Sequence, residues 1–119
     1  MSTTNVIIIA LVIIFLVWRF LPTKGVRNIT AAQLKNELGD RNKQYIDVRT
    51  PGEFKGRSIN GFKNIPLNQL PAKALSLAKD KEVIVICQSG MRSKNACKIL
   101  KKQGFAKITN VSGGMSAWH

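Results

Sequence analysis

The sequence predicts an α/β domain, a parallel sheet flanked by helices on both faces, preceded by one transmembrane helix. Two patterns carry this prediction. Strand and helix signals alternate after residue 26, and residues 6–21 are apolar apart from one charge. Alternating strands and helices imply parallel strands joined by right-handed crossovers. We therefore divide the chain into a transmembrane helix at 5–22 and a folded domain at 26–119.

The apolar stretch VIIIALVIIFLVWRFL is typical of a signal peptide or of a retained membrane helix. A signal peptide needs a basic leader and small residues at a cleavage site, and neither MSTTN nor WRFLPTKG provides them. A buried core helix is also disfavoured, because the stretch has no polar face to present to water. A helix of this length rises ~24 Å, short of the ~30 Å hydrocarbon core, so flanking residues such as Trp18 must help. The retained anchor is the preferred interpretation.

The distribution of charge predicts how such an anchor is oriented. All 19 basic and all 6 acidic side chains follow residue 18, which places the net charge of +13 on the C-terminal part. Because basic residues are enriched on the cytoplasmic side of a membrane helix, the pattern predicts a single-pass membrane protein with its C-terminal domain facing the cytoplasm. Lipid headgroups would then attract the basic domain. No nucleic-acid-binding motif accompanies the charge, so no nucleic-acid partner is expected.

Turn residues and apolar patterns delimit the first elements of the domain. Thr30 and Gln33 have the spacing of a capping box, which predicts a helix from there to Leu38 with Gly39 as its stop. The next elements predicted along the chain are a strand at 44–48, a short helix around Glu53, a brief strand at 64–67 and a helix near 72–78.

Residues 82–86, EVIVI, form the clearest strand signal in the chain. The run is continuous and β-branched, as expected of a central parallel strand covered on both faces. It ends at Cys87, and a helix to about Lys102 and a last strand near 107–111 follow. Because ligands of parallel α/β sheets bind at the carboxyl ends of the strands, Cys87 stands where a site is expected.

The position of Cys87 favours an anionic sulfur. A thiol between a strand and a helix N-terminus faces backbone N–H groups that lack intrahelical partners, and these stabilise a thiolate. Gly90 lets the backbone curl into an anion-binding nest, and Arg92 adds a cation whose planar fork suits oxyanions. We therefore expect Cys87 to be more reactive than Cys97. The alternative, an inert cysteine packed in a strand, is disfavoured by the glycine and arginine that follow.

Three motifs, in order and suitably spaced, resemble the rhodanese homology domain over residues 26–118. CQSGMRS at 87–93 resembles its active-site loop, YIDVRTPGEFKGRSINGFKNIPL at 45–67 its central region, and GGMSAW at 113–118 its closing motif. The resemblance implies a rhodanese-like domain at 26–119. It also implies the functional residues: Cys87 as the sulfur acceptor, Arg92 as the second catalytic residue, Asp47 and Arg49 as supporting residues, and a substrate-binding loop of Gln88, Ser89, Gly90, Met91, Arg92 and Ser93.

The activity implied by this resemblance is sulfur transfer through a persulfide on Cys87. The donor would be thiosulfate or another sulfane compound, and the acceptor a thiol, cyanide or a protein, with no metal or organic cofactor. A membrane-tethered persulfide relay or docking module with little turnover of its own is the alternative. A phosphatase or arsenate reductase is less favoured, because the loop from Cys87 to Arg92 has the family's shorter, sulfurtransferase length and position 93 is serine.

Two further positions qualify the resemblance. Ser58 stands where many members of the family have a histidine, and we expect this change to alter local packing rather than the activity. Cys97 lies on the helix after the loop, ~9 Å beyond Met91, too far for an unstrained disulfide with Cys87. It is interpreted as a core thiol.

Overall fold

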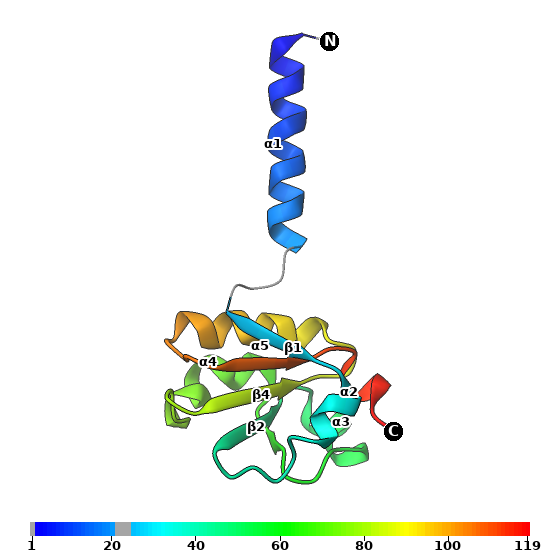
Figure 1. Cartoon of the computed structure of the whole chain (residues 1–119), viewed down its shortest axis with the longest axis vertical. Coiled ribbons are helices and arrows are strands. Elements are labelled where there is room, and N and C mark those ends of the chain that lie inside the picture. The colour runs from blue at the N-terminus through cyan, green and yellow to red at the C-terminus, as the bar shows by residue number, and fades with distance from the viewer. Residues whose placement is uncertain (1, 21–24) are drawn as a thin grey trace.

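A five-stranded parallel sheet organises the domain in the computed structural model, which describes residues 2–20 and 25–119. The strand order is β1-β5-β4-β2-β3 (Figure 1), so β4 is the central strand. All four neighbouring pairs are parallel, as the sequence predicts. The strands are β1 (Val26–Ile29), β2 (Lys43–Asp47), β3 (Lys63–Asn64), β4 (Glu82–Ile86) and β5 (Ile108–Val111).

Helices cover both faces of the sheet, which confirms the predicted α/β class. The α-helices are α1 (Thr3–Phe20), α2 (Ala31–Lys35), α3 (Pro51–Gly56), α4 (Leu70–Lys73) and α5 (Met91–Lys102). Short 3-10 turns complete the chain: η1 (Leu67–Gln69), η2 (Ala74–Ser76) and η3 (Gly114–Ala117). The core contacts assign α4 and α5 to one face, and α2 and η3 to the other.

The central strand β4 supplies apolar side chains to both layers of the core. Val83 and Val85 point to the face covered by α4 and α5, and Ile84 and Ile86 point to the opposite face. All four are fully buried. A parallel strand covered on both faces loses the polar alternation of a half-exposed strand, which is why its sequence pattern is so clear. Cys87 continues the first of these rows.

Two capping boxes determine where α2 and α3 begin. The Thr30 hydroxyl accepts from the Gln33 N–H, and the Gln33 side chain accepts from the Thr30 N–H, as predicted. Thr50 and Glu53 make the same reciprocal pair at α3. Each box satisfies backbone donors that have no partner within the helix. The helix predicted to reach Leu38 ends earlier, at Lys35, and turns lead from there to Gly39.

Other element boundaries differ from the sequence-based expectations. The strand β1 was not predicted, the strand expected at 64–67 is β3 at Lys63–Asn64, and the helix expected near 72–78 consists of α4 and η2. β1 lies at the edge of the sheet and exposes its two middle residues, so its sequence lacks the signal of a buried strand.

The prediction of a membrane anchor is wrong. Within residues 2–20 and 25–119, no helix is long and apolar enough to cross a membrane. Helix α1 has 18 residues, which corresponds to a rise of ~27 Å, less than the ~30 Å hydrocarbon core. The apolar pattern was therefore overinterpreted, and the single-pass localisation, the cytoplasm-facing orientation and the membrane partner are not supported. Residues 21 and 22 of the predicted span, and Lys24, lie outside the described residues.

An ion-pair cluster joins the amino ends of three strands, at the edge of the sheet away from Cys87. Glu37 pairs with Arg27 of β1 and with Lys43 of β2, whose Nζ lies 2.6 Å from Oε1. Lys43 also pairs with Glu82 of β4 at 3.1 Å. Hydrogen bonds from the two cations lower the pKa of Glu37. The cluster therefore stabilises the folded chain while Glu37 is ionised.

Replacing Glu37 by Gln should lower the free energy of unfolding by about 1 kcal/mol at neutral pH. Because the folded-state pKa of Glu37 lies below its unfolded value, this stabilisation is complete above about pH 4.3 and is lost as the pH falls through the folded-state value. Urea unfolding of both proteins across this range is the measurement. If the difference in free energy of unfolding between the wild type and Glu37→Gln were the same at the lowest pH as at neutral pH, the stabilisation could not come from ionised Glu37.

Candidate active site

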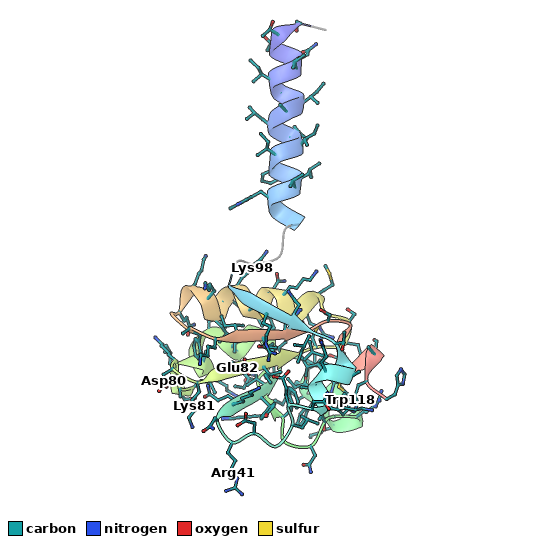
Figure 2. The ribbon with its side chains drawn as sticks, in the orientation of Figure 1. Arg41, Asp80, Lys81, Glu82, Lys98 and Trp118 are labelled. Carbon is teal, nitrogen blue, oxygen red and sulfur yellow. The ribbon has the colours of Figure 1, made fainter. Side chains whose placement is uncertain are left out.

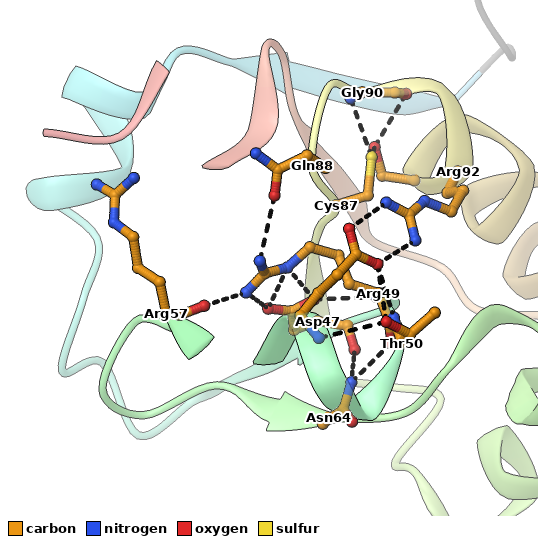
Figure 3. Close-up of polar contacts among 11 residues, drawn as sticks. Asp47, Arg49, Thr50, Arg57, Asn64, Cys87, Gln88, Gly90 and Arg92 are labelled. Atoms are coloured by element: carbon orange, nitrogen blue, oxygen red, sulfur yellow. Dashed lines mark hydrogen bonds and ion pairs between the residues drawn. The ribbon is translucent and has the colours of Figure 1, made fainter. Parts of the chain in front are cut away.

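The Cys87 sulfur lies between the end of β4 and the start of α5. Its Sγ accepts a hydrogen bond from the Gly90 N–H at 2.9 Å, and its thiol donates to the Ser93 hydroxyl at 3.4 Å (Figure 3). The Ser93 hydroxyl in turn donates to the Gly90 carbonyl at 3.0 Å. Gly90 caps α5 with φ +106°, a conformation that residues with a Cβ rarely adopt. The predicted curl of the backbone at Gly90 is thus present, with its amide directed at the sulfur.

The C-terminal turn η3 holds the base of this loop. The Met115 N–H donates to the Cys87 carbonyl at 2.8 Å, and the Ser116 N–H donates to the Gln88 carbonyl at 2.9 Å. Gly114 lies against the same peptide: a Cβ built on it would be 2.2 Å from the Cys87 carbonyl oxygen. The sequence GGMSAW therefore acts as a platform beneath residues 87 and 88. This contact was not predicted from the residues.

Asp47 and Arg49 form a buried ion pair at the end of β2, the strand next to β4. Arg49 donates from Nη2 to Asp47 Oδ2 at 2.8 Å and from Nε to Oδ1 at 3.0 Å. Both side chains are almost fully buried. Arg49 Nη1 also donates to the Gln88 side-chain oxygen at 3.2 Å, and Nη2 donates to the Arg57 carbonyl at 2.5 Å. The two residues expected to support the site thus connect β2 to the loop (Figure 3).

Arg92 makes a bidentate ion pair with Glu53 of α3. Its Nη1 and Nη2 donate to the two carboxylate oxygens at 2.6 and 2.9 Å. The Arg92 hydrogen bonds, with help from the Thr50 N–H and hydroxyl, lower the pKa of Glu53 to about 2. The same pairing raises the pKa of Arg92, to which the charge of Cys87 also contributes. Sequence reasoning missed Glu53 as a site residue, although its capping-box spacing from Thr50 was visible.

The predicted loop residues occupy different environments. Ser93 is fully buried beside the sulfur, and Gln88 is half-buried between Arg49 and Ser116. Ser89 is exposed, and Met91 is 71% exposed at the first position of α5. The loop therefore has an inner side that holds the sulfur and an outer side that faces solvent.

Cys97 shares the core layer of Cys87 but differs in its surroundings. It lies within α5 and is a free, buried cysteine. Burial, and to a smaller extent the charge of Cys87, raises its pKa to about 12. This agrees with its interpretation as a core thiol. Ser58, at the position of the family's histidine, is exposed at the end of α3.

Replacing Gly114 by Ala should displace the loop, because the new methyl group would overlap the backbone of Cys87 and Gly114 has φ +55°. We expect a loss of about 2 to 4 kcal/mol in the free energy of unfolding. Gly52→Ala is the matched control: it lies in α3 with open space around its Cβ position, and its effect should stay within about 1 kcal/mol. If chemical denaturation showed that Gly114→Ala and Gly52→Ala lower the free energy of unfolding equally, the proposed platform would be contradicted.

In a Cys87→Ser variant, Cys97 is the remaining thiol and should resist iodoacetamide while the protein is folded. A pKa of about 12 leaves about one thiol in a thousand ionised at about pH 9, and burial blocks access. Alkylation followed by mass spectrometry should show modification after unfolding in urea. Rapid labelling of the folded variant would overturn the assignment of Cys97 to the core.

Comparisons with known proteins show which family the folded domain resembles. The rhodanese-like domain family model matches residues 30–119. A putative sulfurtransferase of Bacillus subtilis, YtwF, is 44% identical over 94 residues, covering 78% of this chain and 90% of that protein. The thiosulfate sulfurtransferase GlpE of Shewanella oneidensis is 29% identical, with coverages of 78% and 92%. The crystal structure of a rhodanese-like domain protein from Staphylococcus aureus superimposes with a TM-score of 0.72 at 34% identity, covering 78% of this chain and 91% of that one. The chain belongs to the rhodanese-like domain family.

Proposed function

We propose that the chain is a sulfurtransferase that carries sulfur as a persulfide on Cys87. One observation carries the proposal: the Cys87 sulfur lies at the carboxyl end of the central strand and accepts a hydrogen bond from the Gly90 amide at the start of α5. Relatives named as sulfurtransferases support the same activity. Thiosulfate or another sulfane compound would be the donor, and a thiol, cyanide or a protein cysteine the acceptor.

The proposed reaction has two halves. In the first, the Cys87 thiolate attacks the outer sulfur of thiosulfate. A new S–S bond forms, the original S–S bond breaks, and sulfite leaves with the bonding electron pair. In the second, an acceptor thiolate attacks the outer sulfur of the persulfide, takes it as its own persulfide, and releases the Cys87 thiolate. Electrons and charge balance in both halves, so neither half consumes a cofactor.

The residues around the sulfur have distinct roles in this proposal. The Gly90 amide stabilises the negative charge on the thiolate. The Ser93 hydroxyl, which accepts from the thiol in the resting state, can rotate from the Gly90 carbonyl and donate to the sulfur when the proton has left. In this proposal the backbone of Gln88, Ser89 and Met91 would surround the transferred sulfur, and Arg92, in the first turn of α5, would supply a cation.

Incubation of the protein with thiosulfate should add the mass of one sulfur atom, measured on the intact chain and removed by a thiol reductant. Cys87→Ser should prevent the gain, because it removes the accepting sulfur. Cys97→Ser is the matched control and should still load, since Cys97 is buried within α5. Loading of the Cys87→Ser variant, or failure of the wild-type chain to load from any sulfane donor, would refute the proposed function.

A further inference from the structure

Both arginines of the site are paired with a carboxylate. Arg49 is paired with Asp47 in the interior, and Arg92 is paired with Glu53 at the mouth of the loop. Each pair uses both oxygens of its carboxylate. Two positive charges at a site for anions are thus matched by two negative ones. The Gly90 amide and the N-terminal end of α5 also attract an anion at this position.

The Glu53 carboxylate cannot easily turn away from Arg92. Its Oε1 accepts from the Thr50 N–H at 3.1 Å and from the Thr50 hydroxyl at 3.0 Å, as part of the capping box of α3. Removing it from this position would leave the start of the helix unsatisfied. A pKa of about 2 means that Glu53 is ionised throughout the physiological pH range. The negative charge is therefore a permanent feature of the site.

Arg92 lies in the first turn of α5, the helix whose N-terminal cap, Gly90, donates its N–H to the Cys87 sulfur. The charge of Cys87 contributes to the raised pKa of Arg92. An oxyanion that approaches Cys87 therefore meets a guanidinium whose two terminal nitrogens already donate to the Glu53 carboxylate. Repulsion by that carboxylate grows in proportion to the charge of the donor.

We propose that Glu53 is a specificity-determining residue that makes the site prefer singly charged sulfane donors, such as organic thiosulfonates and persulfides, over the dianion thiosulfate. The inference rests on the proposed function and names the class of donor for the same site. The net charge of +13 attracts every anion, but its long-range part is screened beyond ~8 Å at physiological salt. The charges beside the sulfur decide between donors of similar shape.

Benzenethiosulfonate and thiosulfate form a pair of donors that react in the same way and carry different charges. In both, the Cys87 thiolate attacks a terminal sulfur bonded to a sulfonyl sulfur, and that S–S bond breaks. Benzenesulfinate leaves in one case and sulfite in the other, each with the bonding electron pair, and the same persulfide forms. The donors thus share the reacting atoms and differ by one unit of charge and by a phenyl group in place of one oxygen, a difference that cancels when each variant is compared with the wild type.

The experiment compares kcat/KM for the two donors in the wild-type chain and in Glu53→Gln. Glutamine can still accept from the Thr50 N–H, so the capping box is kept while the charge is removed. We expect the ratio of thiosulfate to benzenethiosulfonate activity to rise roughly fivefold. Glu53→Asp, which keeps the charge, should retain a ratio close to that of the wild type.

Asp80→Asn is the charge-matched control. Asp80 is exposed in the turn before β4, at the amino end of the strand (Figure 2), whereas Cys87 follows the carboxyl end of the same strand. The substitution changes the net charge by the same amount and should leave the ratio unchanged. An unchanged ratio in Glu53→Gln, equal losses with both donors, or an equal rise in Asp80→Asn would overturn the inference.

The mass of the intact chain after incubation with each donor separates this inference from the proposed function. If the wild-type chain and Glu53→Gln both gain one sulfur on Cys87 and the donor ratio does not change, only the role of Glu53 is refuted. If the wild-type chain gains no sulfur from either donor, the proposed function fails, and the role of Glu53 fails with it.

Discussion

The backbone N–H and C=O groups at the carboxyl ends of the strands need hydrogen bonds. The segments that supply these hydrogen bonds also form the candidate site. Buried N–H and C=O groups need hydrogen bonds, and a parallel sheet cannot supply them at this edge by a tight hairpin. Turn η3 satisfies the carbonyl of Cys87. The Asn64 amide satisfies the carbonyls of Asp47 and Arg49. The same bonds that complete the sheet therefore place the sulfur, the buried ion pair and the loop beside one another.

The same packing pairs each arginine near Cys87 with a carboxylate. Arg49 is buried, and a buried charge is tolerated only when it is paired and its hydrogen bonds are satisfied, so Asp47 accompanies it. Arg92 is partly exposed and could have remained unpaired, yet α3 brings Glu53 to it. The chain is strongly basic, but Arg49 and Arg92 are each paired with a carboxylate.

The parts of the fold that were predictable depend on local patterns. The strand β4, helix α5 and the capping box at Thr30 follow from residues close together in the chain, and the structure reproduces them. β1 was missed because an exposed edge strand has no distinctive pattern. The membrane anchor was wrong because no helix in the described residues, the 18-residue α1 included, is long and apolar enough to cross a membrane. In the site, residues 87–93 could be located from the loop itself. The pairing of Arg92 with Glu53, 39 positions away, depends on tertiary structure.

The two cysteines show what distinguishes a chemical site from a core position. Cys87 and Cys97 belong to the same apolar layer and are equally buried. Cys97 lies inside α5, where backbone donors are used by the helix, so burial, with a smaller contribution from the charge of Cys87, raises the pKa of its thiol to about 12. Cys87 precedes the first turn of that helix, where backbone N–H groups lack helical acceptors and one of them donates to the sulfur. The surroundings of the two sulfurs thus differ in one respect: a backbone N–H that lacks a helical acceptor donates to Cys87, whereas Cys97 lies where the N–H groups are bonded within the helix.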